Sequence, residues 1–182
     1  MKNRISLITS ESVSRSIWMG TFHSIFARIL RSEAPLIGYP SNFTIYDTYD
    51  SEKLISNIIK EKKLDKDTYK AKSIKNRISS LKNNFITVEN YFNNSELIEV
   101  DKAAKRDLFG EIYQEYVRRC FKASVMDFDD LLLKTNELLN KSPETLLKYQ
   151  QKFKYILVDE YQDTNYSQYL IVKALADRHE NL

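Results

Sequence analysis

Residues 154–165 read Lys-Tyr-Ile-Leu-Val-Asp-Glu-Tyr-Gln-Asp-Thr-Asn and are the most informative stretch of this chain. Its apolar run, residues 155–158, is short and partly β-branched, which is typical of a strand covered on both faces of a parallel sheet. Asp159 and Glu160 follow at once, at the edge where open α/β sheets bind ligands. A carboxylate there can hold a hydrated Mg²⁺, and its neighbour can orient or deprotonate an attacking water. The alternative is a buried strand that simply ends in a polar turn.

Three segments together resemble a known family. Residues 158–165 resemble motif II, the Walker B element, of superfamily 1A DNA helicases of the UvrD/PcrA/Rep type. Residues 20–24, Gly-Thr-Phe-His-Ser, resemble the family's motif Ib, which touches single-stranded DNA. Residues 126–132, Met-Asp-Phe-Asp-Asp-Leu-Leu, resemble the segment where the family's chain returns to its first motor domain. The segments occur in the family's order, and the resemblance covers nearly the whole chain.

This resemblance implies a mainly α fold with two structural parts. A helical insertion domain of the 1B type is attached to a partial RecA-like α/β domain, 1A, with a few short parallel strands. Residues 1–38 are the expected exit portion of 1A, residues 39–123 the 1B domain, and residues 124–182 the return portion with the Walker B motif. The strands expected at 17–20 and 155–158 would lack neighbours, and such unpaired edges favour self-association.

The resemblance also assigns roles to the residues of the Walker B segment. It implies that Asp159 holds Mg²⁺ through water and that Glu160 is the base that activates the attacking water. Gln162 is expected to sense the γ-phosphate or to couple the nucleotide to DNA, whereas Asp163 is expected to make a structural hydrogen bond. Mg²⁺ and ATP are therefore the expected cofactors of the full-length parent, and none is expected in the fragment.

Two regions are candidates for DNA contact. The resemblance implies that Thr21, Phe22 and His23 face single-stranded DNA; the alternatives are core packing for Phe22 and a structural hydrogen bond for His23. Residues 60–82 carry nine basic and only three acidic side chains, a balance that attracts a phosphate backbone without reading its sequence. The alternative is a solvated helix face. The basic side chains are Lys60, Lys62, Lys63, Lys66, Lys70, Lys72, Lys75, Arg77 and Lys82, of which Lys70, Lys72, Lys75 and Arg77 are the chosen DNA contacts.

The chain has no phosphate-binding loop. Its three glycines, Gly20, Gly38 and Gly110, do not fall in a Gly-x-x-x-x-Gly-Lys-Ser/Thr pattern. Phosphoryl transfer depends on positioning and charge stabilisation, which one carboxylate pair cannot supply alone. The resemblance implies an ATP-dependent 3′-to-5′ helicase as the parent, and the missing loop leads us to expect that the isolated chain is inactive.

Two other classes of function stay open from the sequence. One is a non-catalytic nucleic-acid-binding or protein-docking helical module, and the other is a structural helical domain without a ligand. Within the helicase interpretation, the sequence fits repair, replication restart and plasmid replication equally. It also fits a helicase–nuclease fusion, because the nuclease would lie outside this chain.

Composition indicates a soluble globular protein, with 42% hydrophobic and 29% charged residues. The single Cys120 excludes an intrachain disulfide, fits a reducing cytoplasm and is interpreted as a small core residue. Two histidines and one cysteine argue against zinc. No apolar run reaches the ~20 residues of a membrane span, and no long apolar region follows residues 1–4, so neither a membrane nor a signal peptide is expected.

Apolar periodicity and capping residues predict the helices. Thr21, Asp47, Thr87, Asp127, Ser142 and Asn165 are expected to lie at helix starts. A single long helix is predicted over 100–123, since its apolar residues form one broad face. The remaining expectations are helices over 22–31 and 69–83, an extended segment at 43–46, and a final helix after Asn165.

Overall fold

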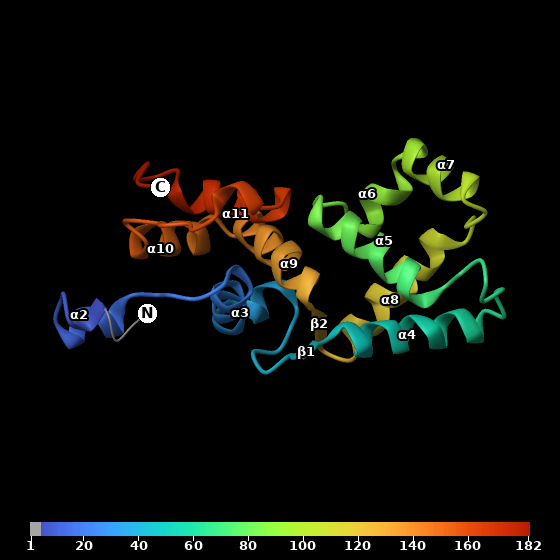
Figure 1. The fold of residues 1–182 in the computed structure, drawn as a ribbon, viewed down its shortest axis with the longest axis horizontal. Coiled ribbons are helices and arrows are strands. Elements are labelled where there is room, and N and C mark those ends of the chain that lie inside the picture. Colours follow the sequence, from blue (N-terminus) through green and yellow to red (C-terminus); the bar gives the residue numbers. More distant parts are fainter. Residues whose placement is uncertain (1–4) are drawn as a thin grey trace.

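The computed structural model describes residues 5–182 and is mainly helical (Figure 1). Residues 1–4, which entered the expectation about a signal peptide, lie outside the described residues. None of the described helices combines the length and the apolar character that a bilayer crossing needs. The elements in chain order are α2 (Glu11–Ser16), α3 (Phe22–Glu33), η1 (Ala34–Ile37), β1 (Thr44–Tyr46), α4 (Thr48–Glu61), α5 (Ala71–Asn83), α6 (Val88–Phe92), α7 (Ser95–Ala103), α8 (Phe109–Lys122), β2 (Val125–Asp127), α9 (Phe128–Lys141), α10 (Pro143–Lys152), η2 (Tyr161–Asp163) and α11 (Tyr166–Ala176).

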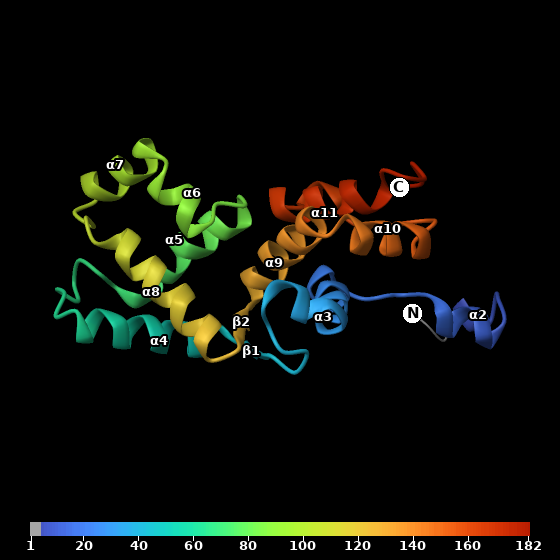
Figure 2. The same ribbon diagram turned by 180° about the vertical axis from the view of Figure 1, so that it is seen from behind.

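The described helices form two lobes with separate hydrophobic cores. The inserted lobe contains α4 to α8, residues 48–122, and the terminal lobe contains α3 and α9 to α11, residues 22–33 and 128–176 (Figures 1 and 2). Cys120 is buried in the core of the inserted lobe, which confirms its interpretation as a core residue. The terminal-lobe core includes Phe26, Ile29, Leu30, Leu131, Leu132, Leu138, Tyr149, Ile171 and Leu175, and the inserted-lobe core includes Ile55, Ile58, Ile74, Ile78, Phe109, Ile112, Tyr113 and Tyr116.

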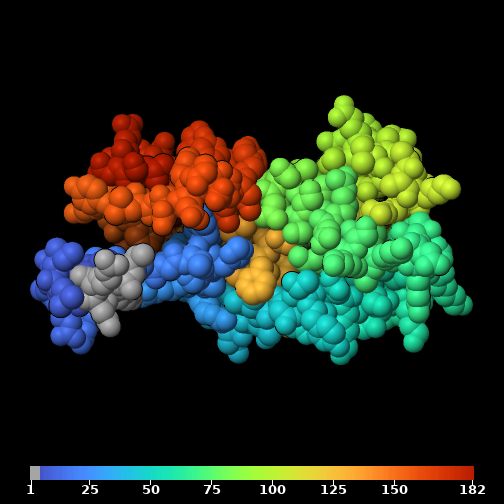
Figure 3. Space-filling view, viewed as in Figure 1, coloured from blue at the N-terminus to red at the C-terminus, as the bar shows by residue number. Residues whose placement is uncertain are grey.

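A two-stranded parallel ladder lies where the chain passes between the lobes. β1 leads out of the terminal lobe and β2 leads back, with Thr44 opposite Val125, Ile45 opposite Met126 and Tyr46 opposite Asp127. β2 is buried along its whole length. The terminal lobe also meets the inserted lobe directly, because α5 contacts α9 and α11; their surfaces adjoin in the space-filling view (Figure 3).

The predicted helix starts are confirmed, because each capping side chain accepts a hydrogen bond from a backbone N–H of the first turn. Reciprocal capping boxes, in which the residue three positions on also bonds back, occur at Asp47, Thr87, Asp127 and Asn165. Thr21 caps α3, and Ser142 caps α10 before the proline at its start. These caps satisfy N–H groups that would otherwise lack partners.

The prediction of one helix over 100–123 is wrong, because the chain breaks between α7 and α8. Lys105 adopts a left-handed φ of 58°, and its N–H bonds to the carbonyl of Lys102 at 2.8 Å. The N–H of Arg106 bonds to the carbonyl of Asp101 at 2.8 Å. This is a Schellman C-cap, which glycine usually occupies. Because the sequence has a lysine and not a glycine at this position, it contains no signal for the end of a helix. The apolar residues of 100–123 therefore appear to form one continuous helical face.

The strands predicted at 17–20 and 155–158 are also wrong. Residues 17–20 are irregular and join α3 to α2, which stands apart from the terminal lobe (Figures 1 and 2). Residues 155–158 run without a ladder partner, and Leu157 and Tyr155 are 96% and 78% exposed. A buried parallel strand needs other strands paired along its edges and helices on both faces. Among the described residues, the Ile156 N–H bonds to the Asn181 carbonyl at 2.9 Å and Ile156 packs on the terminal-lobe core, but no strand pairs with 155–158. Since neither segment is a strand, neither has an unpaired strand edge that could support the expected self-association.

Candidate functional site

The carboxylates of Asp159 and Glu160 lie on an exposed loop that begins after the irregular segment 155–158. Glu160 has left-handed backbone angles, φ 51° and ψ 46°, and Asp159 Oδ1 accepts a hydrogen bond from the Glu160 N–H at 3.1 Å. A left-handed non-glycine residue is uncommon and is found disproportionately at functional sites. The two residues thus sit outside any helix and face solvent, although the strand expected to present them is absent.

The loop continues through η2 and ends at a firmly held residue. Gln162 and Asp163 are exposed, and the Thr164 hydroxyl donates to the Tyr161 carbonyl at 2.8 Å. Asn165 then starts α11, where its Oδ1 accepts from the Gln168 N–H at 2.9 Å. We call residues 159–164 the carboxylate loop. The structure places its chemistry-bearing side chains in solvent and fixes only its C-terminal end.

Thr21, Phe22 and His23 lie at the start of α3, and each makes a contact within the terminal lobe. The Thr21 hydroxyl accepts from the Ser24 N–H at 3.3 Å. Phe22 is half-buried with its ring centroid 5.7 Å from that of Phe26, and His23 meets the ring of Phe128 edge-on at 5.7 Å. The packing of Phe22 agrees with the core alternative, and DNA contact at these three positions stays a prediction.

The basic segment divides into paired and exposed side chains. Lys75 lies 3.9 Å from Asp129, and the Arg77 guanidinium is 3.1 Å from the Asp101 carboxylate. Lys62 pairs with Glu111 at 2.6 Å. The side chains that stay exposed to solvent around the end of α4 and the start of α5 are Lys60, Lys63, Lys66, Lys70 and Lys72. We call these five the lysine surface.

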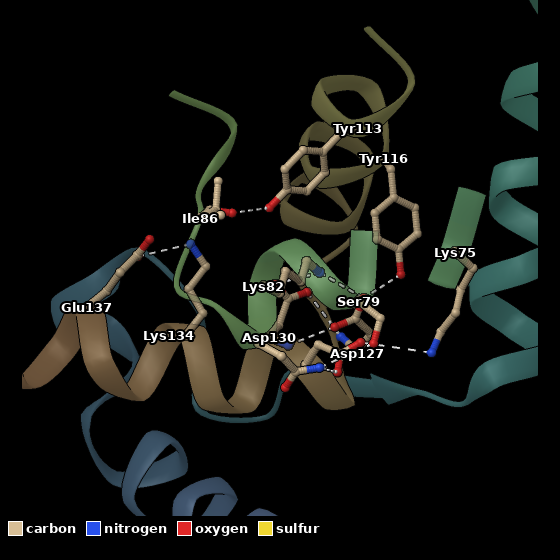
Figure 4. Close-up of polar contacts among 12 residues, drawn as sticks. Lys75, Ser79, Lys82, Ile86, Tyr113, Tyr116, Asp127, Asp130, Lys134 and Glu137 are labelled. Carbon is tan, nitrogen blue, oxygen red and sulfur yellow. Dashed lines mark hydrogen bonds and ion pairs between the residues drawn. The ribbon is translucent and has the colours of Figure 1, made fainter. Parts of the chain in front are cut away.

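Lys82 is wrongly counted among the phosphate-attracting lysines, because its side chain is completely buried. Its Nζ lies 2.8 Å from Asp127 Oδ2 and 2.8 Å from Asp130 Oδ1, and the Tyr116 hydroxyl donates to Asp127 Oδ2 at 2.7 Å. Figure 4 shows Lys82 from α5 directed at the two carboxylates, with Tyr116 reaching them from α8. We call this group the buried charge cluster. It connects the inserted lobe to β2 and α9.

Burial and mutual charge set the protonation of the buried charge cluster. Burial, aided by the neighbouring charge of Asp127, raises the pKa of Asp130 to about 6. Burial acts in the same direction on Asp127, but the Lys82 ammonium and the Tyr116 hydroxyl hold the pKa of Asp127 below its ordinary value. Burial opposes the charge on Lys82, yet the two carboxylates raise its pKa. The cluster is thus a charged, closed structural group rather than a site open to a ligand.

The buried charge cluster could not be predicted from the sequence, for a physical reason. The capping pattern of Asp127 and Asp130 is local and visible, and the structure confirms it. Their partner Lys82 lies 45 residues earlier than Asp127 and looks like any other lysine of a basic segment. The one available signal is its place in the pattern of Ile74, Ile78 and Leu81, which puts Lys82 next to the buried face of α5.

Over its whole length, the chain is similar to DNA helicases of one family. The whole chain, residues 1–182, matches the family model described as UvrD/REP helicase N-terminal domain. Over 182 residues it is 41% identical to the ATP-dependent DNA helicase PcrA of Bacillus subtilis (strain 168) and 38% identical to that of Leuconostoc citreum; each match covers 100% of this chain and 24% of the relative. It is 39% identical over 176 residues to the ATP-dependent DNA helicase UvrD1 of Mycobacterium leprae (strain TN), which covers 96% of this chain and 22% of the relative. The chain therefore spans about a quarter of the length of these relatives.

Proposed function

The chain belongs to the UvrD/REP helicase family, and from that premise we propose that it is one part of an ATP-dependent 3′-to-5′ DNA helicase. The two PcrA relatives described above are ATP-dependent DNA helicases about four times as long as this chain. The observation that carries the proposal is the exposed carboxylate loop, in which Asp159 and Glu160 lie outside any helix and are open to a nucleotide. Such a protein works on DNA in the cytoplasm.

The proposed domain limits are 1–38 and 124–182 for the portions of motor domain 1A and 39–123 for domain 1B. Two separate hydrophobic cores support this division. The parallel pair of β1 and β2 supports it as well, because a chain that leaves one lobe and returns beside its exit forms an insertion. The proposed boundaries lie within a few residues of these two strands.

The residues of the carboxylate loop fit a magnesium–nucleotide complex. Mg²⁺ keeps several waters and is usually held by one or two carboxylates together with substrate phosphates, and a single exposed Asp159 suits that arrangement. The ion would neutralise charge on the phosphates. Glu160, the next residue, would then take a proton from the attacking water, and Gln162 would lie on the same loop close to the γ-phosphate.

Substitution of Glu160 in the longer protein tests this assignment. Glu160→Gln should lower ATP turnover by about 10²-fold or more, because the amide cannot accept the proton, while ATP binding persists. Asp163→Asn is the matched control on the same loop and should change turnover little. Turnover that survives in Glu160→Gln would refute the catalytic role of Glu160. The 182-residue chain alone should show no ATP turnover, since it has no phosphate cradle.

The lysine surface is the proposed contact to duplex phosphates. Because a phosphate contact releases counterions, binding of a labelled duplex to the 182-residue chain should weaken steeply with salt. The double variant Lys70→Glu/Lys72→Glu reverses two exposed charges, whereas Lys75 and Arg77 already hold acidic partners. It should bind more weakly and with a shallower salt dependence. The charge-matched control is Lys122→Glu/Lys154→Glu, in which both lysines are also exposed. Equal binding by both double variants would exclude the lysine surface, and no binding of the wild type at low salt would favour a purely structural domain.

A further inference from the structure

One side chain, Asn83 at the end of α5, bridges three elements. Its Nδ2 donates to Asp129 Oδ1 of α9 at 3.0 Å and to Ser79 Oγ one turn earlier at 3.3 Å. Its Oδ1 accepts from Asn165 Nδ2 at 2.8 Å, across 82 positions of sequence. Both ends of this half-buried amide therefore have partners outside α5.

The orientation of the two amides is determined by their neighbours. Asp129 Oδ1 accepts the hydrogen bond from Asn83, so the Nδ2 of Asn83 must face it. The Oδ1 of Asn83 is then turned to Asn165. The Oδ1 of Asn165 accepts from the Gln168 N–H, which leaves its Nδ2 for Asn83. Neither amide can flip without losing a bond to a charged group or to a helix cap.

The pair connects two regions with different proposed tasks. Asn165 is the residue directly after the carboxylate loop, and Asn83 closes the helix that begins beside Lys70 and Lys72 of the lysine surface. Lys82, the residue before Asn83, attaches the same end of α5 to Asp127 and Asp130. The end of α5 is thus fixed on the terminal lobe, and a displacement of α5 moves the residue that holds the carboxylate loop.

We propose that Asn83 is a positioning residue for ATP hydrolysis: through Asn165 it sets the place of the carboxylate loop relative to α5, and so makes hydrolysis respond to DNA held by the lysine surface. The inference rests on the proposed function. Its physical basis is a continuous chain of hydrogen bonds from α5 to the end of the loop, which is a physical route by which binding at one site can alter the other.

The first test uses the 182-residue chain and is independent of any activity. Asn83→Ala removes the bridge, and Asn165→Ser keeps a good helix cap but is too short to reach Asn83. The matched control is Asn84→Ala, because the Asn84 amide donates only to Ser80 of its own helix. Amide hydrogen exchange of residues 160–164 should be faster in both bridge variants than in the wild type and the control. Unchanged exchange in both would overturn the positioning role.

The second test measures ATP turnover in the longer protein with and without a DNA duplex that carries a single-stranded tail. Asn83→Ala should reduce the stimulation by DNA, which is the ratio of the DNA-stimulated to the DNA-free rate, about fivefold or more, with the affinity for DNA unchanged. The double variant Asn83→Ala/Asn165→Ser should be no worse than either single one, because both break the same bond. An equal fall of the DNA-free and stimulated rates, or multiplicative effects in the double variant, would overturn the inference. A wild type without DNA-stimulated turnover would instead refute the proposed function.

Discussion

At the scale of single residues, Lys82 is the side chain whose charge depends most strongly on its neighbours. Its ammonium is shielded from water and faces two carboxylates that are themselves buried. A buried ion pair adds little net stability over a well-packed apolar group, but removal of one partner leaves the other charge unpaired in a medium that solvates it poorly. The effect of a substitution at Lys82 on stability therefore depends on the two buried carboxylates that remain without their cation.

Lys82→Met should destabilise the chain by about 3–5 kcal/mol, because Asp127 and Asp130 would stay buried without their cation. Urea denaturation followed by circular dichroism measures this difference in the free energy of unfolding. Lys72→Met, an exposed lysine on the same helix, is the control and should cost less than about 0.5 kcal/mol. Equal costs for the two variants would contradict the buried charge cluster.

Asp130 makes a pH-dependent contribution to stability with a defined sign. Its pKa rises from 3.8 to about 6 on folding, so between these values the folded chain binds more protons than the unfolded chain. The free energy of unfolding due to this group therefore falls as pH rises through that window. Asp130→Asn lacks the group, so the stability of the wild type relative to Asp130→Asn should decrease from pH 4 to pH 6. Urea titrations of both proteins at several pH values measure it; a relative stability that rises with pH would contradict the assignment.

At the scale of elements, the sequence predicted what local chemistry determines. Capping residues such as Asp47, Asp127 and Asn165 act on N–H groups within three positions, and all are confirmed. The break before α8 was missed because a lysine, not a glycine, adopts the left-handed conformation. The strand predicted at 155–158 is absent because a parallel strand depends on neighbouring strands, and the apolar run gives no information about those neighbours.

The candidate site shows the same division between local and distant information. The string that begins at Asp159 indicated the loop and its carboxylates, which the structure finds exposed. The bridge from Asn83 to Asn165 could not be predicted, since it joins residues 82 positions apart that have no pattern in common. The side-chain chemistry of the loop could thus be predicted from the sequence. The partner that holds the end of the loop, Asn83, could not.

The packing of α6 on α8 depends on the absence of a side chain at Gly110. A Cβ there would lie 2.8 Å from Tyr91 Cε1 and 2.9 Å from Phe92 Cζ. Phe92 is partly exposed and can move, but the ring of Tyr91 is buried and its hydroxyl donates to Asp101. Gly110→Ala should therefore destabilise the chain by about 1–3 kcal/mol, even though alanine favours a helix.

The measurement for Gly110→Ala is the urea midpoint, with Glu111→Ala as the control at the adjacent exposed position. Loss of the exposed Lys62–Glu111 pair should cost less than about 1 kcal/mol. If Gly110→Ala were stabilising, helix propensity would outweigh the contact with Tyr91, and the close approach of α6 to α8 would be refuted.

At the scale of the whole molecule, the two lobes have separate cores but share polar connections. The buried charge cluster joins α5 and α8 to α9, and the Asn83–Asn165 bond joins α5 to α11. The β1–β2 ladder adds a third connection. Two cores linked in this way should unfold together, whereas two cores linked only by loops would unfold independently.

Each lobe contains a natural probe of its own. Trp18 is the single tryptophan and packs on the terminal lobe, with its ring 5.2 Å from that of Phe153 and the Arg28 guanidinium 3.8 Å above it. Cys120 is the single cysteine and lies in the inserted-lobe core, where burial raises the pKa of its thiol to about 12. A thiol reagent should therefore modify Cys120 only after the inserted lobe opens, because the thiolate is the reactive form.

In the wild type, Trp18 fluorescence and pulse labelling of Cys120 should give the same urea midpoint. In Lys82→Met the two midpoints should separate, because the charge that joins α5 and α8 to α9 is gone while each apolar core remains. Asp130→Asn, which keeps Lys82 paired with Asp127, should separate them less, and Lys72→Met should leave them coincident. Coincident midpoints in Lys82→Met would mean that the ladder and the Asn83 bridge suffice to couple the lobes. Separate midpoints in the wild type would mean that the polar connections do not couple them, and a displacement of α5 could then not be passed to the carboxylate loop.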